Sequence, residues 1–183
     1  MGDLIFTDVM NPGVKLIECH GFFIPDYLEI RNVQTITIDD HLNPARLYPF
    51  TAYVYNNNLY LTDAIGNIAF IDARLSYITP TAPLRRSHPE YRKVSSHGHD
   101  AGHIGLSLGQ HPSIAMEQDS YMNRFGIWRM FERYWKRILN EGSTVRLIAV
   151  FADGEYTYSP FWCIHEEIDG NIEEYVFTND DEQ

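Results

Sequence analysis

The sequence predicts an α+β fold in which an antiparallel β-sheet packs against one amphipathic helix. Most of the chain consists of short apolar segments separated by turn residues, which is typical of antiparallel strands. Residues 124–140 instead repeat apolar side chains every three or four positions, which is typical of a helix. The 183 residues, 44% hydrophobic and 14% aromatic, are enough for one domain with its own core.

The strands are predicted by alternation and by the turns between them. Asn at 56–58 and Gly66-Asn67 supply the positive φ that tight hairpins need, so residues 50–80 predict a β-meander. The core is expected to span residues 50–178, with residues 1–50 as an N-terminal extension and 179–183 as a frayed acidic tail. The expected strands are residues 14–18, 33–38, 51–55, 59–62, 68–75, 144–151, 161–165 and 174–177.

The helix predicted over residues 124–140 has an apolar stripe and a basic remainder. It ends at Asn140-Glu141-Gly142, where the glycine is a C-terminal signal. The stripe comprises Ile127, Trp128, Phe131, Trp135, Ile138 and Leu139.

Several classes of protein are excluded by the composition. No apolar run approaches the roughly 20 residues that span a bilayer, and the N-terminus lacks the pattern of a signal peptide. We therefore expect a protein without membrane contact, either cytoplasmic or exported by a secretion system that needs no signal peptide. Cys19 and Cys163, the only cysteines, are read as two partly buried thiols, although a single disulfide stays open.

The distribution of charge is uneven. The chain carries −11 overall, but residues 85–137 hold nine Lys and Arg against five Asp and Glu. One basic segment inside an acidic protein is the pattern expected of a local site for a polyanion. A basic helix flank neutralised by acidic neighbours is the alternative.

Histidines gather in the same basic segment, at His97, His99 and His103. The run from 97 to 103 superficially resembles the H-x-H-x-D-H zinc pattern of the metallo-β-lactamases. Its aspartate and last histidine are displaced by one residue from that pattern, so we reject a zinc hydrolase.

A second resemblance fits better. Asp100-Ala101-Gly102-His103 resembles the D-[RG]-G-H core of the DNA/RNA non-specific endonucleases, a His-Me finger family, and particularly the nuclease domains of bacterial polymorphic toxins. The second half of that signature, roughly P-Q-x(4)-N-x-G-x-W-x(3)-E, is matched in order by Gln118, Asn123, Gly126, Trp128 and Glu132. The resemblance covers roughly residues 50–178. It implies a ββα-metal motif on the antiparallel sheet.

The resemblance also implies roles for individual residues. His103 would be the general base, because a neutral imidazole can take a proton from water. Asn123 would ligate one Mg²⁺ or another divalent cation directly and Glu132 through water, since Mg²⁺ prefers oxygen ligands and keeps several waters. Arginine binds phosphate bidentately. The remaining candidates are Arg92 and Arg129 as catalytic phosphate clamps, and Arg124, Gln118 and His99 as substrate contacts.

Each role has a simpler alternative. His103 could be a structural histidine, Asn123 a helix N-cap, and Glu132 the partner of Lys136 one turn on. Two departures from the family pattern bear on the site. Ala101 replaces an arginine, and Phe125 is an extra residue between Asn123 and Gly126.

The function expected from this reading is a Mg²⁺-dependent endonuclease acting on DNA without sequence preference, with RNA left open as a second substrate. The resemblance further implies an antibacterial effector toxin with a cognate immunity protein. The rival is an acidic non-enzymatic binding protein, of the immunity or nucleic-acid-mimic type, or a degenerate nuclease fold kept for interaction. The negative charge outside residues 85–137 motivates the rival, whereas the complete set of His103, Asn123 and Glu132 favours the enzyme.

Overall fold

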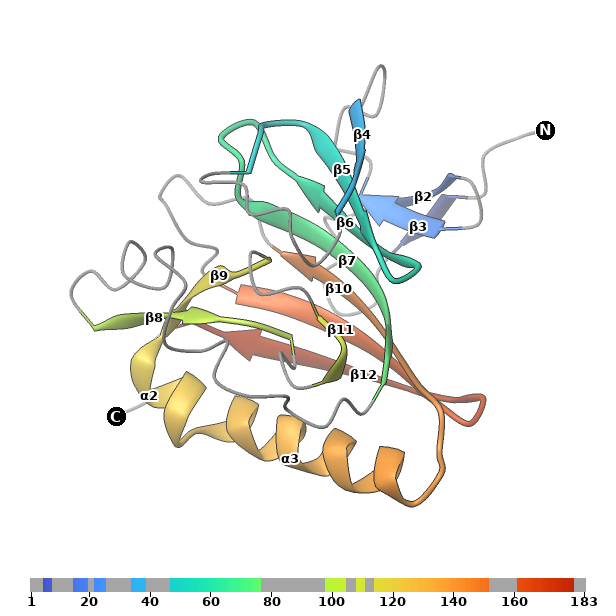
Figure 1. Ribbon diagram of the computed structural model, residues 1–183, viewed down its shortest axis with the longest axis vertical. Helices are drawn as coiled ribbons and strands as arrows, with labels where there is room; N and C mark the ends of the chain where they lie inside the picture. Colours follow the sequence, from blue (N-terminus) through green and yellow to red (C-terminus); the bar gives the residue numbers. More distant parts are fainter. Residues whose placement is uncertain are drawn as a thin grey trace.

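A seven-stranded sheet forms the centre of the protein, seen in a computed structural model (Figure 1). The structure describes residues 5–7, 15–19, 22–25, 34–38, 47–76, 98–104, 108–110, 114–151 and 161–179. The strand order is β12-β11-β10-β7-β6-β5-β4, and every neighbouring pair is antiparallel except β4 with β5. The strands are β4 (Gln34–Thr37), β5 (Thr51–Tyr55), β6 (Asn58–Thr62), β7 (Ile68–Leu75), β10 (Val145–Phe151), β11 (Phe161–Ile168) and β12 (Asn171–Thr178).

The segment that holds the candidate site is inserted between two neighbouring strands. β7 pairs directly with β10, from Leu75 opposite Val145 onward, although β8, β9 and both described helices lie between them in the sequence. β8 (His99–Gly102) and β9 (Met116–Asp119) form a separate two-stranded ribbon, followed by α2 (Ser120–Arg124) and α3 (Ile127–Asn140). The sheet therefore provides a continuous support from which this segment projects.

Helix α3 lies alongside the sheet near β11 and β12 (Figure 1). Aromatic side chains make the contact between them. Trp128 and Trp135 are fully buried, and the Trp128 ring centroid lies 5.5 Å from that of Trp162 on β11 and 5.2 Å from that of Phe177 on β12. Edge-to-face packing of this kind adds to the hydrophobic burial. The predicted helix is thus confirmed as the element that covers the core.

The predicted turns are also confirmed. Asn56 and Asn57 adopt φ of 49° and 62° between β5 and β6, as a two-residue hairpin turn requires. Gly142 follows α3 with φ of +96°, the left-handed conformation that commonly ends a helix.

Some expectations about boundaries were wrong. The predicted start of the helix at residue 124 is replaced by a break, because Arg124 ends α2 and α3 begins at Ile127. Ile127, placed on the apolar stripe, is 54% exposed because it lies at the edge of the buried face. Asn179, expected in a frayed tail, is 1% exposed, because its amide holds the backbone of β9. Residues 180–183 lie outside the described part of the chain.

The first fifty residues contribute to two sheets. The strand expected at 33–38 is confirmed as β4, an edge strand of the central sheet, and the Ile38 amide continues the ladder by bonding to the Val54 carbonyl at 2.8 Å. The strand expected at 14–18 is confirmed as β2 (Lys15–Cys19), which pairs with β1 (Ile5–Thr7) and β3 (Phe22–Pro25). None of the helices described is long and apolar enough to cross a membrane.

Candidate functional site

The β8–β9 ribbon leads directly into the helices. Asp100 lies opposite Gln118 in the ribbon, and the Ser120 amide bonds to the Gly98 carbonyl at 2.9 Å where β9 passes into α2. Asp119 is the N-cap of α2, since its carboxylate accepts a 2.8 Å hydrogen bond from the Met122 amide. This cap satisfies one of the amides left free at a helix start and fixes the direction in which α2 leaves the ribbon.

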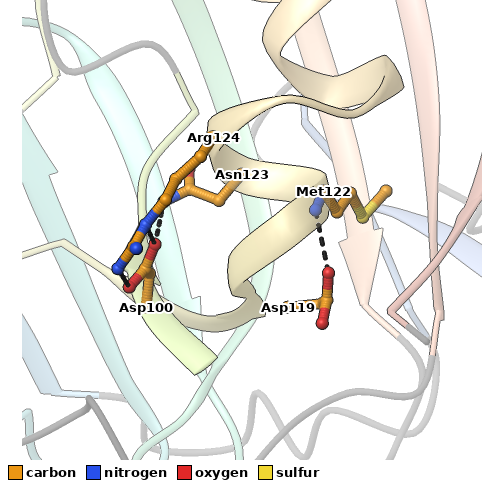
Figure 2. A network of polar contacts seen from close by, with 5 residues as sticks. All are labelled: Asp100, Asp119, Met122, Asn123 and Arg124. Atoms are coloured by element: carbon orange, nitrogen blue, oxygen red, sulfur yellow. Dashed lines mark hydrogen bonds and ion pairs between the residues drawn. The ribbon is translucent and has the colours of Figure 1, made fainter. Parts of the chain in front are cut away.

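Asp100 is the centre of a polar network between the ribbon and α2 (Figure 2). Its carboxylate accepts from Arg124 Nε at 2.6 Å and Nη2 at 2.5 Å, and from Asn123 Nδ2 at 3.3 Å. Burial opposes ionisation of this carboxyl, but the hydrogen bonds from Arg124 and Asn123 outweigh it and lower the pKa of Asp100. Asp100 is therefore a carboxylate at neutral pH and orients two predicted site residues at once.

His103 follows the end of β8, and a side chain of α3 bonds to its backbone. The residue is 6% exposed, and its carbonyl accepts a 3.3 Å hydrogen bond from the indole nitrogen of Trp128. Because Trp128 is fully buried, this bond ties the backbone of His103 to the core.

The glycine of the Asp-Ala-Gly-His motif is required by close packing. A Cβ on Gly102 would lie 2.1 Å from Oε1 and 2.7 Å from Cβ of Gln118, the glutamine across the ribbon. Gln118 is fully buried, and neither its Oε1 nor its Nε2 has a hydrogen-bond partner among the described residues. Leaving a buried amide unpaired costs stability. The protein therefore keeps a polar side chain, Gln118, against the residue that precedes His103.

Asn123 is not a helix N-cap. Asp119 caps α2 and Gly126 precedes α3, while Asn123 lies within α2. The N-cap interpretation was therefore wrong, and the side chain instead donates from α2 to Asp100 on β8.

The extra residue, Phe125, lies in the break between the helices. Its amide and that of Gly126 both bond to the Tyr121 carbonyl at 2.8 Å, and its side chain is 73% exposed. A Cβ at Gly126 would lie 2.7 Å from the Met122 Cα, so glycine permits the close turn. Phe125 thus lies in the turn between the helices, and Asn123 contacts Asp100 on β8.

The remaining candidates form two further pairs. Arg129 Nη1 lies 2.9 Å from Oε2 of Glu132, whose side chain is only 15% exposed. His99 Nδ1 lies 3.5 Å from Oε1 of Glu117, a contact between β8 and β9 that the sequence reading did not foresee. Arg92 and His97 lie outside the described residues.

The structure therefore brings Asn123 and Arg124 together on Asp100, and Arg129 together with Glu132 on α3. Asp100 was quoted in the motif without a role, and its position opposite a helix could not be read from local sequence. Among the described residues, no group of three or more His, Cys, Asp or Glu side chains is arranged to hold a metal.

Comparison with known proteins shows a likeness of fold. No protein-family model matches the chain, and no curated protein matches its sequence. Among solved structures it resembles NucA from Streptococcus agalactiae, crystallised with no metal bound, with a TM-score of 0.51 and 12% sequence identity. The match covers 91% of this chain and 79% of NucA, so it extends beyond the expected core of residues 50–178.

Proposed function

We propose that this chain is a metal-dependent endonuclease that hydrolyses phosphodiester bonds of DNA, with His103 as the general base. The shared fold with NucA, a nuclease, supports a hydrolase of this broad class. The observation that carries the finer proposal is the 3.3 Å hydrogen bond from Asn123 to Asp100, because it joins helix α2 to the strand that ends at Gly102, directly before His103.

The donor set fits a hard divalent cation. The Nδ2 of Asn123 donates to Asp100, which fixes the amide so that its Oδ1 faces away from that carboxylate and is available as an oxygen ligand. Glu132 would act through water, and Mg²⁺ commonly keeps several waters beside one or two protein oxygens. When bound, such a cation would polarise the scissile phosphate and stabilise the leaving oxygen.

The chain's own residues supply the remaining chemistry. His103 would accept a proton from the attacking water, which forms a new bond to phosphorus while the bond to the leaving sugar oxygen breaks. Near-complete burial of His103 and its carbonyl bond to Trp128 restrict its motion, which favours a fixed angle of attack. Arg129 lies beside Glu132 on α3 and would stabilise charge on the phosphate.

A plasmid-nicking assay tests this proposal. We expect wild type to nick supercoiled DNA with Mg²⁺ and not with EDTA, and His103→Ala to lose most activity, since general-base catalysis contributes about 10²–10⁴-fold. The matched control is His165→Ala, because His165 lies on β11 and pairs with Glu174 on the exposed surface.

Two results would count against the proposal. Intact plasmid at low salt across several divalent metals would favour the rival, an acidic binding protein. Equal nicking by wild type and His103→Ala would remove His103 from the site while leaving a nuclease. A parallel assay on RNA decides whether RNA is a second substrate, and inhibition by a cognate immunity protein stays a prediction.

A further inference from the structure

Two aromatic side chains beside the candidate site are exposed to solvent. Tyr121 and Phe125 are 57% and 73% exposed, and their ring centroids lie 6.1 Å apart, one turn apart along the chain. They flank Asn123 and Arg124 in the sequence, the two residues that contact Asp100. Large apolar rings are more stable when they are removed from water. We therefore expect a ligand to cover these two rings, which lie beside the polar network of Asp100.

The charge of the helical segment that carries these rings indicates an anionic occupant. Residues 120–140 hold five basic side chains and one acidic side chain, in a chain of net charge −11. The single acid, Glu132, is only 15% exposed and pairs with Arg129. Arg133 and Arg137 are exposed, so the outward charge of α3 is positive, and Arg124 remains 59% exposed although it pairs with Asp100.

We infer that Tyr121 and Phe125 form a stacking subsite for unpaired nucleobases, next to the phosphate that the proposed nuclease cleaves. This inference rests on the proposed function and deepens it by naming the substrate class as single-stranded or frayed nucleic acid. Aromatic rings bind bases of any sequence through their π-faces, and arginines beside them hold the backbone.

The arrangement of α2 favours nucleic acid over an apolar protein surface. Around the helix, Arg124 lies between Asn123 on one side and the Tyr121–Phe125 pair on the other, since successive residues turn by about 100°. The Asn123 amide, which we propose binds the metal, the Arg124 guanidinium and the two rings thus lie in that order around one turn of the helix. The groups that would contact phosphate are therefore next to the rings that would contact a base, as phosphate and base are neighbours within a nucleotide. Bases inside a duplex are stacked on each other and cannot reach the rings, so a preference for unpaired strands follows.

Binding to short labelled oligonucleotides in EDTA tests the subsite without cleavage. We expect wild type to bind a single strand more tightly than the same strand with abasic positions or than a blunt duplex. Tyr121→Ala/Phe125→Ala should weaken single-strand binding by about tenfold per ring and abolish the difference between normal and abasic strands. Tyr121→Phe should retain both, because the ring remains.

Tyr48→Ala is the matched control. Tyr48 is 60% exposed and precedes β5, which lies at the opposite end of the molecule from α3 (Figure 1), so its removal should leave binding unchanged. If wild type binds normal and abasic strands equally tightly, the proposed subsite is wrong. It is also wrong if the double variant loses the same affinity for a single strand as for a duplex. The plasmid assay is independent of these results. If wild type nicks DNA but binds normal and abasic strands equally, the nuclease proposal stands and the stacking subsite is rejected.

Discussion

Arg124 and Arg146 each bind one aspartate through Nε and Nη2, but the two pairs lie in different surroundings. Arg124 reaches Asp100 at 2.6 and 2.5 Å, with 59% of the arginine side chain and 15% of the aspartate side chain exposed. Arg146 reaches Asp72 at 2.9 and 2.7 Å between β10 and β7, and the corresponding exposures are 29% and 4%.

The difference lies in what else each aspartate binds. Asp72 and Arg146 connect neighbouring strands of the central sheet, where Arg146 also lies 3.9 Å from Glu167. Asp100 additionally accepts from Asn123, a proposed metal ligand. The same bidentate geometry therefore stabilises the sheet in one place and, by our proposal, positions a functional amide in the other.

The largest effect is expected from Arg146→Ala. This change leaves Asp72 as an unpaired carboxylate that is 3% exposed, and uncompensated buried charges cost about 3 kcal/mol. Urea denaturation should show that loss in the free energy of unfolding, while nicking per folded molecule should be unchanged. A loss of activity in folded Arg146→Ala would remove the distinction between the pairs.

Asp100→Asn is expected to affect activity more than stability. Outer-shell partners of metal ligands typically contribute about 10–100-fold, and we expect a lower nicking rate with a higher Mg²⁺ requirement. Because the Arg124–Asp100 pair is largely exposed on the arginine side, the free energy of unfolding should fall by about 1 kcal/mol or less. Asp169→Asn is the control, since Asp169 bonds to Thr144 at the far end of α3; a merely structural Asp100 would leave the Mg²⁺ requirement unmoved.

A smaller effect is expected from Glu166, the buried carboxylate beneath α3. Burial raises its pKa despite a hydrogen bond from the Trp135 indole, and Glu173 opposite it on β12 adds to this shift, while Tyr175 opposes it. The folded state then holds a proton that the unfolded state releases, so stability falls as pH rises through the window above the ordinary value of 4.5. In wild type the free energy of unfolding should decrease with pH across that window, and in Glu166→Gln this decrease should disappear. An unchanged decrease would assign the pH dependence to another group.

The smallest effect is the acid dependence of the Asp100 pair. Its pKa is lowered in the folded state, so its contribution to stability is complete above the ordinary value of 3.8 and disappears as pH falls through the lowered value. The free energies of unfolding of wild type and Asp100→Asn should converge in acid. A gap that persists where the Asp100 carboxyl is protonated in the folded state would show that the pair acts through packing instead of charge.

Local periodicity predicted those parts of the fold that depend on neighbouring residues. The Asn and Gly turns identified β5 to β7, alternation identified β4, and the three-to-four spacing identified α3, because each signal comes from residues close together in the sequence. The parallel pairing of β4 with β5 was missed, since strand partners are not encoded within a strand. The break at Phe125 was missed because residues 124–126 were assigned to the helix, although its apolar stripe begins only at Ile127.

The candidate site was predictable to the extent that it follows a motif. His103, Asn123 and Glu132 came from the resemblance, whereas Asp100 bonds to Arg124 across 24 positions and Asn179 reaches β9 across 60. Such contacts depend on how elements are placed in space, so a single sequence does not reveal them. The unpaired amide of Gln118 likewise becomes visible only when its burial is known.

The hydrogen bond from Trp128 to the His103 carbonyl gives the protein a built-in optical reporter. The indole is packed against Trp135 and Trp162 in the core, yet its nitrogen binds the backbone of the proposed catalytic histidine. Any displacement of that backbone on occupancy of the site changes the polarity at the indole. Intrinsic tryptophan emission should therefore follow loading of the site in the unlabelled protein.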